Sequence, residues 1–153
     1  MKVRIEVNEE MQEEEIVIRC KAMDDNIKKI KLDIETMRTK EVGMVFYRDE
    51  KEFFLKLNNI LFFETENNNI TAHTIDTVFT VKYKLYELEE ILPKYFIRIS
   101  KSTILNVNEV IAITKNISSS SLIEFKGTHK NVYVSRHYYK GLKIKLEEVR
   151  SRK

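Results

Sequence analysis

Cysteine, glycine and proline are scarce in this chain of 153 residues. The single Cys, Cys20, excludes an intramolecular disulfide framework and is compatible with a reducing compartment. Three scattered Gly and one Pro provide no flexible linker and no phosphate-binding loop of the P-loop or dinucleotide type. The longest apolar runs, such as 60–63, are far shorter than a membrane span, and the N-terminus turns acidic where a signal peptide would be apolar. The sequence therefore predicts a soluble, cytoplasmic protein.

Charge is divided unevenly along the chain, although the formal net charge is only +3. The segment Lys94–Lys153 holds 13 of the 27 Lys and Arg but only 4 of the 24 Asp and Glu, so it carries +9 and the rest carries −6. Such asymmetry favours a polyanionic partner, whereas a basic end can equally be a solvated surface. Hydrophobic residues make up 42% of the chain, enough for the core of one domain plus a small extension.

The first 42 residues predict a β-β-α extension. Apolar residues alternate over Val3–Val7 and again over Ile16–Cys20, which is typical of half-buried strands, and Cys20 falls on the predicted core face. An acidic stretch separates the two segments. From Asp24, a candidate N-cap, the period becomes helical, with one apolar face made by Ile27, Ile30, Ile34 and Met37.

Residues 43–153 predict a mainly β (α+β) domain. Short segments rich in β-branched and aromatic residues are separated by turn signals. The predicted strands are Val45–Tyr47, Glu52–Leu57, Leu61–Glu66, Ile70–His73, Val78–Lys82, Phe96–Ile99, Thr103–Leu105, Val110–Thr114, Ser121–Phe125 and Asn131–Val134. A short helix is predicted over Lys84–Leu92 and a C-terminal helix after Ser135, where Ser135 is the candidate N-cap.

No arrangement of residues predicts an enzyme, a cofactor site or a metal site. One Cys and three scattered His do not have metal-ligand spacing, and no Gly-x-Ser-x-Gly elbow is present. Three carboxylates of the short predicted helix, Glu87, Glu89 and Glu90, are better read as a solvent-facing surface. His73 is better read as a strand residue than as a catalytic base.

Three clusters outside the apolar pattern have chemistry that suits nucleic acid. A turn carrying Ser100, Lys101 and Ser102 offers hydroxyls and an ammonium to phosphates and base edges. Arg136, at a helix start, could reach guanine, and the Asn67–Asn69 loop could pair with adenine. Each cluster also has a structural reading, as a turn or a helix cap. No helix-turn-helix pattern is present, so DNA reading would fall to loops and a helix start.

Four motifs in these regions resemble the LytTR-type DNA-binding domain family. Residues 96–106 (FIRISKSTILN) are similar to the family signature F-x-R-x-H-[RK]-S-x-[LIV]-[VL]-N, and residues 60–64 (ILFFE) to its I-x-[YF]-[IVF]-E strand. Residues 83–89 resemble its L-x-x-L-E helix, and residues 134–138 its closing V-S-R-x-Y. Order and spacing agree over about two-thirds of the chain.

The resemblance implies an elongated β domain that binds promoter duplex DNA by inserting loops into successive major grooves. It implies DNA contacts from Asn67–Asn69, from Ser100–Ser102 and from Arg136, with Ser100 in place of the family's frequent His. The candidate base contacts among them are Lys101, Arg136 and one or more of Asn67–Asn69. The basic residues suggested as phosphate contacts are Lys94, Arg98, Lys101, Lys115, Lys140 and Lys143. The complete set of predicted DNA-binding residues is Asn67, Asn68, Asn69, Arg98, Ser100, Lys101, Ser102, Lys115, Arg136, His137 and Lys140.

Only about 42 residues precede the predicted domain, too few for a receiver domain of about 120 residues. The chain is therefore similar to stand-alone members of the family, and the extension is expected to support a homodimer on DNA or to pack on its own domain. Two other functions stay open. One is a protein-interaction module whose basic part is only solvated surface. The other is RNA binding through stacked aromatics such as Phe53, Phe54, Phe62 and Phe63.

Overall fold

The computed structural model describes residues 4–10, 15–38, 43–116 and 119–151. The chain divides into two compact units, Met1–Arg38 and Thr39–Lys153. Each unit is described below by itself.

The first unit contains the predicted helix, α1 (Asp25–Arg38). Asp24 caps it as expected, because its Oδ1 accepts a hydrogen bond of 2.9 Å from the backbone N–H of Ile27. Ile27, Ile30 and Ile34 are partly buried, whereas most other described side chains of this unit are exposed. The helical period was therefore interpreted correctly.

The two predicted strands of the extension are absent from the described residues 4–10 and 15–24, so that part of the prediction is wrong. Ile5 and Val7 are 84% and 88% exposed, and Cys20, predicted to be core, is exposed as well. Val3, the first residue of the predicted alternation, lies outside the described residues. Alternation shows which side chains could share a face, but a strand forms only when its backbone pairs with another strand, and neither segment pairs with one among the described residues of this unit.

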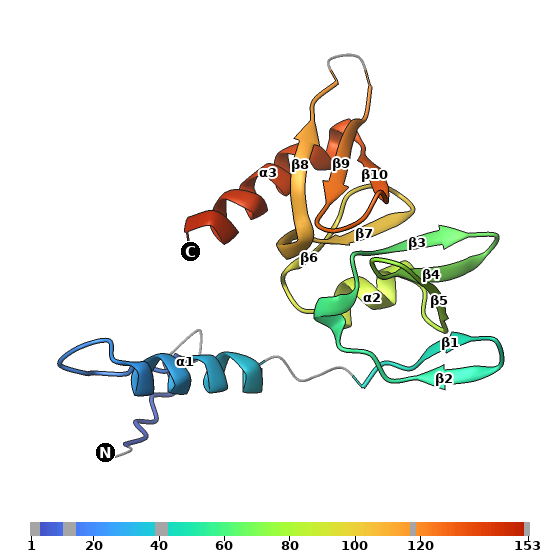
Figure 1. The fold of residues 1–153 in the computed structure, drawn as a ribbon. Helices are drawn as coiled ribbons and strands as arrows, with labels where there is room; N and C mark the ends of the chain where they lie inside the picture. Colours follow the sequence, from blue (N-terminus) through green and yellow to red (C-terminus); the bar gives the residue numbers. More distant parts are fainter. Residues whose placement is uncertain (1–3, 11–14, 39–42, 117–118, 152–153) are drawn as a thin grey trace. The chain divides into compact units, whose positions relative to one another are not determined.

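The second unit is rich in β structure, and its strands and helices follow the predicted order (Figure 1). Among the described residues, no helix combines the length and the apolar composition needed to cross a membrane. The elements are β1 (Phe46–Arg48), β2 (Lys51–Phe53), a 3₁₀ turn (Leu57–Asn59), β3 (Phe62–Glu66), β4 (Asn69–His73), β5 (Val78–Val81), α2 (Leu85–Ile91), β6 (Phe96–Arg98), β7 (Thr103–Asn106), a second 3₁₀ turn (Val107–Glu109), β8 (Val110–Thr114), β9 (Ser121–Phe125), β10 (Asn131–Val134) and α3 (Arg136–Ser151).

The strands form two antiparallel sheets. The larger has the order β2-β1-β5-β4-β3-β7-β6, and the smaller has the order β10-β9-β8. Most neighbours are joined by tight turns, as the Asn, Asp and Ser clusters of the sequence indicated. The mainly β (α+β) fold class, with a short helix and a C-terminal helix, is confirmed.

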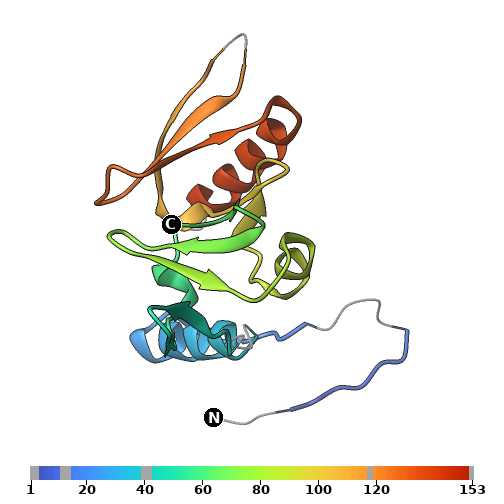
Figure 2. The same cartoon turned by 90° about the vertical axis from the view of Figure 1, so that its right-hand side faces the viewer.

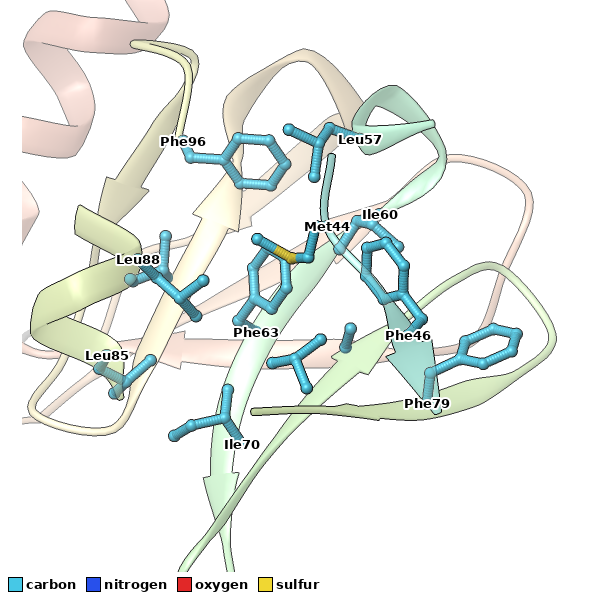
Figure 3. Close-up of a cluster of buried hydrophobic side chains, with 13 residues drawn as sticks. Met44, Phe46, Leu57, Ile60, Phe63, Ile70, Phe79, Leu85, Leu88 and Phe96 are labelled. Carbon is cyan, nitrogen blue, oxygen red and sulfur yellow. The ribbon is translucent and has the colours of Figure 1, made fainter. Parts of the chain in front are cut away.

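Two hydrophobic clusters hold the second unit together, and strand β3 contributes to both. Phe63 points into a cluster with Phe46, Leu88 and Phe96, so that side chains from β1, α2 and β6 meet there (Figure 3). Its neighbour Phe62 points to the opposite face, into a cluster with the smaller sheet and with α3. The centre of the large sheet is therefore buried on both sides, which fixes the positions of the strand ends that carry the candidate site.

Lys130 joins the two sheets on the side of the β4–β5 turn. Its Nζ donates hydrogen bonds to the carbonyl oxygens of Thr74 and Thr77, at 2.8 and 3.0 Å, and Thr128 Oγ1 donates to Ile75 O at 2.9 Å. Figure 2 shows the β4–β5 turn next to the β9–β10 turn, at the left of the view. Burial lowers the pKa of Lys130, and the nearby Asp76 partly offsets that effect. These bonds fix one sheet against the other.

Candidate nucleic-acid interface

The Asn67–Asn69 cluster forms the turn of the β3–β4 hairpin. Glu66 and Asn69 are the last paired residues, so Asn67 and Asn68 alone make the connection. Both have positive φ, 47° and 65°, the combination that a two-residue type I′ turn requires and that Asn tolerates well. All three Asn are exposed. The triplet is therefore a turn, and it also presents its amides to solvent.

The second cluster lies in the connection between β6 and β7. Its two serines bond within the loop, since Ser102 N–H donates to Ser100 Oγ at 3.2 Å and the two hydroxyl oxygens are 3.4 Å apart. Lys101, between them, is exposed, whereas both serines are partly buried. The loop thus uses its hydroxyls to stabilise its own backbone and directs one cationic side chain to solvent.

Arg98, at the end of β6, is engaged inside the protein. Its Nε donates to Ser100 O at 2.8 Å, its Nη2 donates to Lys101 O, and its Nη1 forms an ion pair of 3.0 Å with Glu89 Oε2 of α2. The Arg98 side chain is only 21% exposed. A cavity of about 370 Å³ borders this pair, and its wall continues to His137 and Gly141 of α3.

The third cluster is the start of α3. The backbone N–H groups of Tyr138 and Tyr139 donate to Ser135 O, which closes the first helical turn, and Arg136 is exposed directly after Ser135. His137 and Lys140 are exposed along the first turns. Lys115, at the end of β8, places its ammonium 5.6 Å from the ring centroid of Tyr139, and its side chain is exposed.

Strand pairing brings the three clusters together. Because β3 and β7 are antiparallel and Glu64 is opposite Thr103, the β6–β7 loop lies at the same end of the sheet as the Asn turn. Thr65 N–H donates to Ser102 O at 2.8 Å, and Ser135 N–H donates to Ile99 O at 2.9 Å. The loop is thus bonded through its backbone to the base of the Asn turn on one side and to the start of α3 on the other.

The aromatic pairs do not form a stacking platform for RNA. Phe62 and Phe63 are buried, and Phe53 is partly buried against Phe79 with 5.1 Å between the ring centroids. Phe54 is 78% exposed, alone of the four. No set of three or more His, Cys, Asp or Glu within the described residues could hold a metal ion.

The carboxylates of α2 have individual structural roles. Glu87 Oε2 accepts a hydrogen bond of 2.8 Å from the backbone N–H of Lys84 and so caps the helix, while Glu89 pairs with Arg98. The sequence reading of these acids as a plain solvent face missed both contacts. The Glu-rich turn three residues after Lys84 could have indicated the cap, but no local signal identifies the partner of Glu89.

The second unit therefore has the architecture of a β-rich domain that presents polar and cationic side chains on two turns and one helix start. Its two helices, α2 and α3, do not form a helix-turn-helix, because five strands separate them in the part of the chain that the structure describes. A domain built in this way can contact a duplex through its loops, not through a whole recognition helix.

Comparison with known proteins identifies the family. The model of the LytTr DNA-binding domain matches residues 50–147, and the chain belongs to this family. A solved LytTr DNA-binding domain from Bacillus cereus, described as part of a methyl-accepting/DNA response regulator, superposes with a TM-score of 0.62 at 26% identity, covering 67% of this chain and 94% of that one. The resemblance recognised in the sequence is thus confirmed, and so is the fold that it implied.

Full-length relatives are found in Staphylococcus aureus. Proteins named uncharacterised HTH-type transcriptional regulators, in strains NCTC 8325 / PS 47 and COL, are each 32% identical over 146 residues, which cover 95% of this chain and 98% of theirs. The match therefore extends through the first unit as well as the DNA-binding domain. The label HTH-type belongs to those proteins and does not describe the helices seen in this chain.

Proposed function

We propose that the protein is a non-enzymatic transcriptional regulator that reads a specific promoter sequence through loops placed in the major groove of duplex DNA. The observation that carries this proposal is the joining of the three clusters, through Thr65–Ser102 and Ile99–Ser135 hydrogen bonds, in a LytTr DNA-binding domain. A bacterial protein with this role works in the cytoplasm, and the proposal needs no cofactor.

The residues divide by exposure into two roles. Lys101, Arg136 and the Asn turn are the proposed base contacts, because their side chains are exposed and can form the paired hydrogen bonds that distinguish base edges. Lys115, His137 and Lys140 are also exposed, and we propose that they position the domain on the phosphates. Ser100 and Ser102 contribute mainly through the shape of their loop, since their hydroxyls already bond there.

A selection from randomised duplexes followed by fluorescence anisotropy tests the proposal. The enriched duplex should bind more tightly than random duplex, and log affinity should fall linearly with log salt with a slope of several, about 0.9 per phosphate contacted. A flat salt response or no enriched sequence would argue for the protein-interaction module instead.

Arg136→Ala separates base reading from charge. We expect it to weaken the enriched duplex by about 10-fold to 100-fold, because a lost bidentate guanine contact costs about 1–3 kcal/mol, and to change random-duplex binding much less. Arg150→Ala is the matched control, since Arg150 is exposed on the same helix about 21 Å away. An equal loss of affinity for both duplexes would show that Arg136 contacts a phosphate and not a base.

We also propose that the protein binds DNA as a homodimer assembled through its first unit. Exposed apolar side chains of that unit, including Ile5, Val7, Ile16 and Val17, support a role in association. Light scattering of the full chain, free and on the selected duplex, should give two chains per duplex, and the selected sequence should contain a repeated half-site. One chain on one unrepeated site would refute the dimer.

A further inference from the structure

We propose that Arg98 is not a phosphate contact but the positioning residue that holds the Ile99–Ser102 loop in its DNA-reading shape, with Glu89 of α2 as its anchor. The inference rests on the proposed DNA-binding function and assigns a role inside it. It differs from the expectation drawn from the sequence, where Arg98 was suggested as a phosphate contact because it is a basic residue in the +9 segment.

The Arg98 guanidinium uses three of its five N–H groups within the protein. Each of its three nitrogens has an acceptor, in Ser100 O, Lys101 O and Glu89 Oε2. Only two N–H groups are left for a phosphate, and the side chain that carries them is 21% exposed. Lys101, three residues further, is exposed, so its ammonium is available to DNA without breaking any such bond.

The contacts explain why an arginine, and not another cation, stands here. Two successive carbonyl oxygens of the loop converge on one side chain. The planar fork of a guanidinium donates to both from separate nitrogens while its third nitrogen meets a carboxylate, whereas an ammonium would have to reach all three acceptors from one atom. The other loop bonds, such as Thr65 N–H to Ser102 O, fix the flanks but leave these two carbonyls unpaired. Arg98 therefore sets the backbone of Lys101 and, through it, the direction of the Lys101 side chain.

Glu89 connects this loop to the core. Its helix, α2, is fixed by the buried side chains Leu85 and Leu88, and Glu89 bonds Arg98 Nη1 from the exposed face of that helix. An acid near a DNA-binding surface normally weakens DNA binding by repulsion. Here its effect should have the opposite sign, because it keeps the guanidinium in place.

The two possible roles of Arg98 predict opposite changes in DNA affinity when Glu89 is neutralised, and this difference provides the test. If Arg98 positions the loop, Glu89→Gln should weaken binding of the selected duplex by about 3-fold to 10-fold. If Arg98 contacts a phosphate, Glu89→Gln should strengthen binding, since it removes an acid and releases the guanidinium. Glu90→Gln is the matched control, because Glu90 is exposed on the same helix. It removes the same charge without touching Arg98.

Salt dependence separates the two roles again at Arg98 itself. A positioning role predicts that Arg98→Gln weakens the selected duplex at least 10-fold while the slope of log affinity against log salt stays within experimental error of wild type. A phosphate contact predicts a slope smaller by about 0.9. Arg98→Lys should restore most binding to a phosphate contact but little to a positioning residue, because one ammonium nitrogen would have to replace three separate guanidinium nitrogens.

Hydrogen exchange of the free protein keeps the inference testable whatever the DNA result. The amides of Thr65 and Ser102, which donate to Ser102 O and Ser100 Oγ, should exchange at least 10-fold faster in Arg98→Gln and in Glu89→Gln, but not in Glu90→Gln, while core amides of β7 stay protected. Unchanged loop exchange, or a stronger binding by Glu89→Gln, would overturn the positioning role and leave the proposed function intact. If wild type binds no duplex, the proposed function fails, and loop exchange alone still decides whether Arg98 holds the loop.

Discussion

The stability of the second unit should depend on the protonation of His73. Its ring lies parallel to that of Phe62, with 4.1 Å between centroids, and its Nε2 is 3.1 Å from Thr71 Oγ1. The Thr71 hydroxyl donates to Glu64 O, so we assign the imidazole hydrogen to Nε2, donating to Thr71. Nδ1 is then the bare nitrogen, and it is buried without a hydrogen-bond partner among the described residues.

Burial, assisted by the positive charge of Lys130, lowers the pKa of His73 from 6.5 to about 4. The unfolded chain takes up a proton below pH 6.5, whereas the folded chain resists it until about pH 4. The stabilising effect of a neutral His73 is therefore fully present above pH 6.5 and is lost as the pH falls toward 4. The free energy of unfolding should decrease by about 2 kcal/mol between pH 7.5 and pH 5 from this group alone.

Urea unfolding of wild type and His73→Phe at pH 7.5 and pH 5 measures this effect. Phenylalanine keeps a flat ring against Phe62 and cannot titrate, so the difference in unfolding free energy between the two proteins should change by about 2 kcal/mol over this range. Burial raises the pKa of Glu64, which acts in the opposite direction, because its contribution to stability is lost as pH rises. Parallel pH profiles for wild type and His73→Phe would refute the reasoning.

Helix α3 offers two further predictions, both measured by urea or thermal unfolding. Leu142 is fully buried between α3 and the sheets, so Leu142→Ala should cost about 2–5 kcal/mol, whereas Ile144→Ala, at a side chain that is 50% exposed, should cost less than about 1 kcal/mol. Equal losses would mean that the helix does not pack as described. Gly141→Ala should raise stability by up to about 1 kcal/mol, because a Cβ there meets no atom within 4 Å and glycine weakens a helix interior. Gly141 lies in the wall of the 370 Å³ cavity, so a loss of stability would show that the space beside it is too small for a methyl group in solution.

The sequence predicted the second unit well where local pattern and tertiary contact agree. β8, β9 and β10 have the predicted bounds. In β9 and β10 the residues alternate between more buried ones such as Ile123 and exposed ones such as Glu124, with turn residues between the strands. Phe62 and Phe63 were harder to interpret, because an adjacent pair suggests that one points outward. Both are buried, since β3 lies at the centre of a sheet that is covered on two faces.

The first unit shows the limit of periodicity as a predictor. The α1 helix satisfies its own backbone hydrogen bonds, so a helical period and an Asp24 cap were enough to locate it. The alternating segments around Ile5 and Ile16 could form strands only by pairing with another strand, and their own residues do not indicate whether such a partner is present. Their apolar residues are consequently exposed, and the correct period led to the wrong element.

In the candidate site, too, the sequence identified the residue types but not their partners, which come from distant parts of the chain. Arg98 and Lys101 have the same charge and stand three residues apart, yet one is held by Glu89 and two loop carbonyls and the other is exposed. Lys130 and Lys145 are also engaged, with the Thr74 and Thr77 carbonyls and with Glu148. The +9 of the basic segment therefore overstates the charge that faces a duplex. If Arg98 holds the loop that carries Lys101, as we propose, it acts on DNA recognition by directing the Lys101 side chain, and this effect should persist at salt concentrations that screen a phosphate contact.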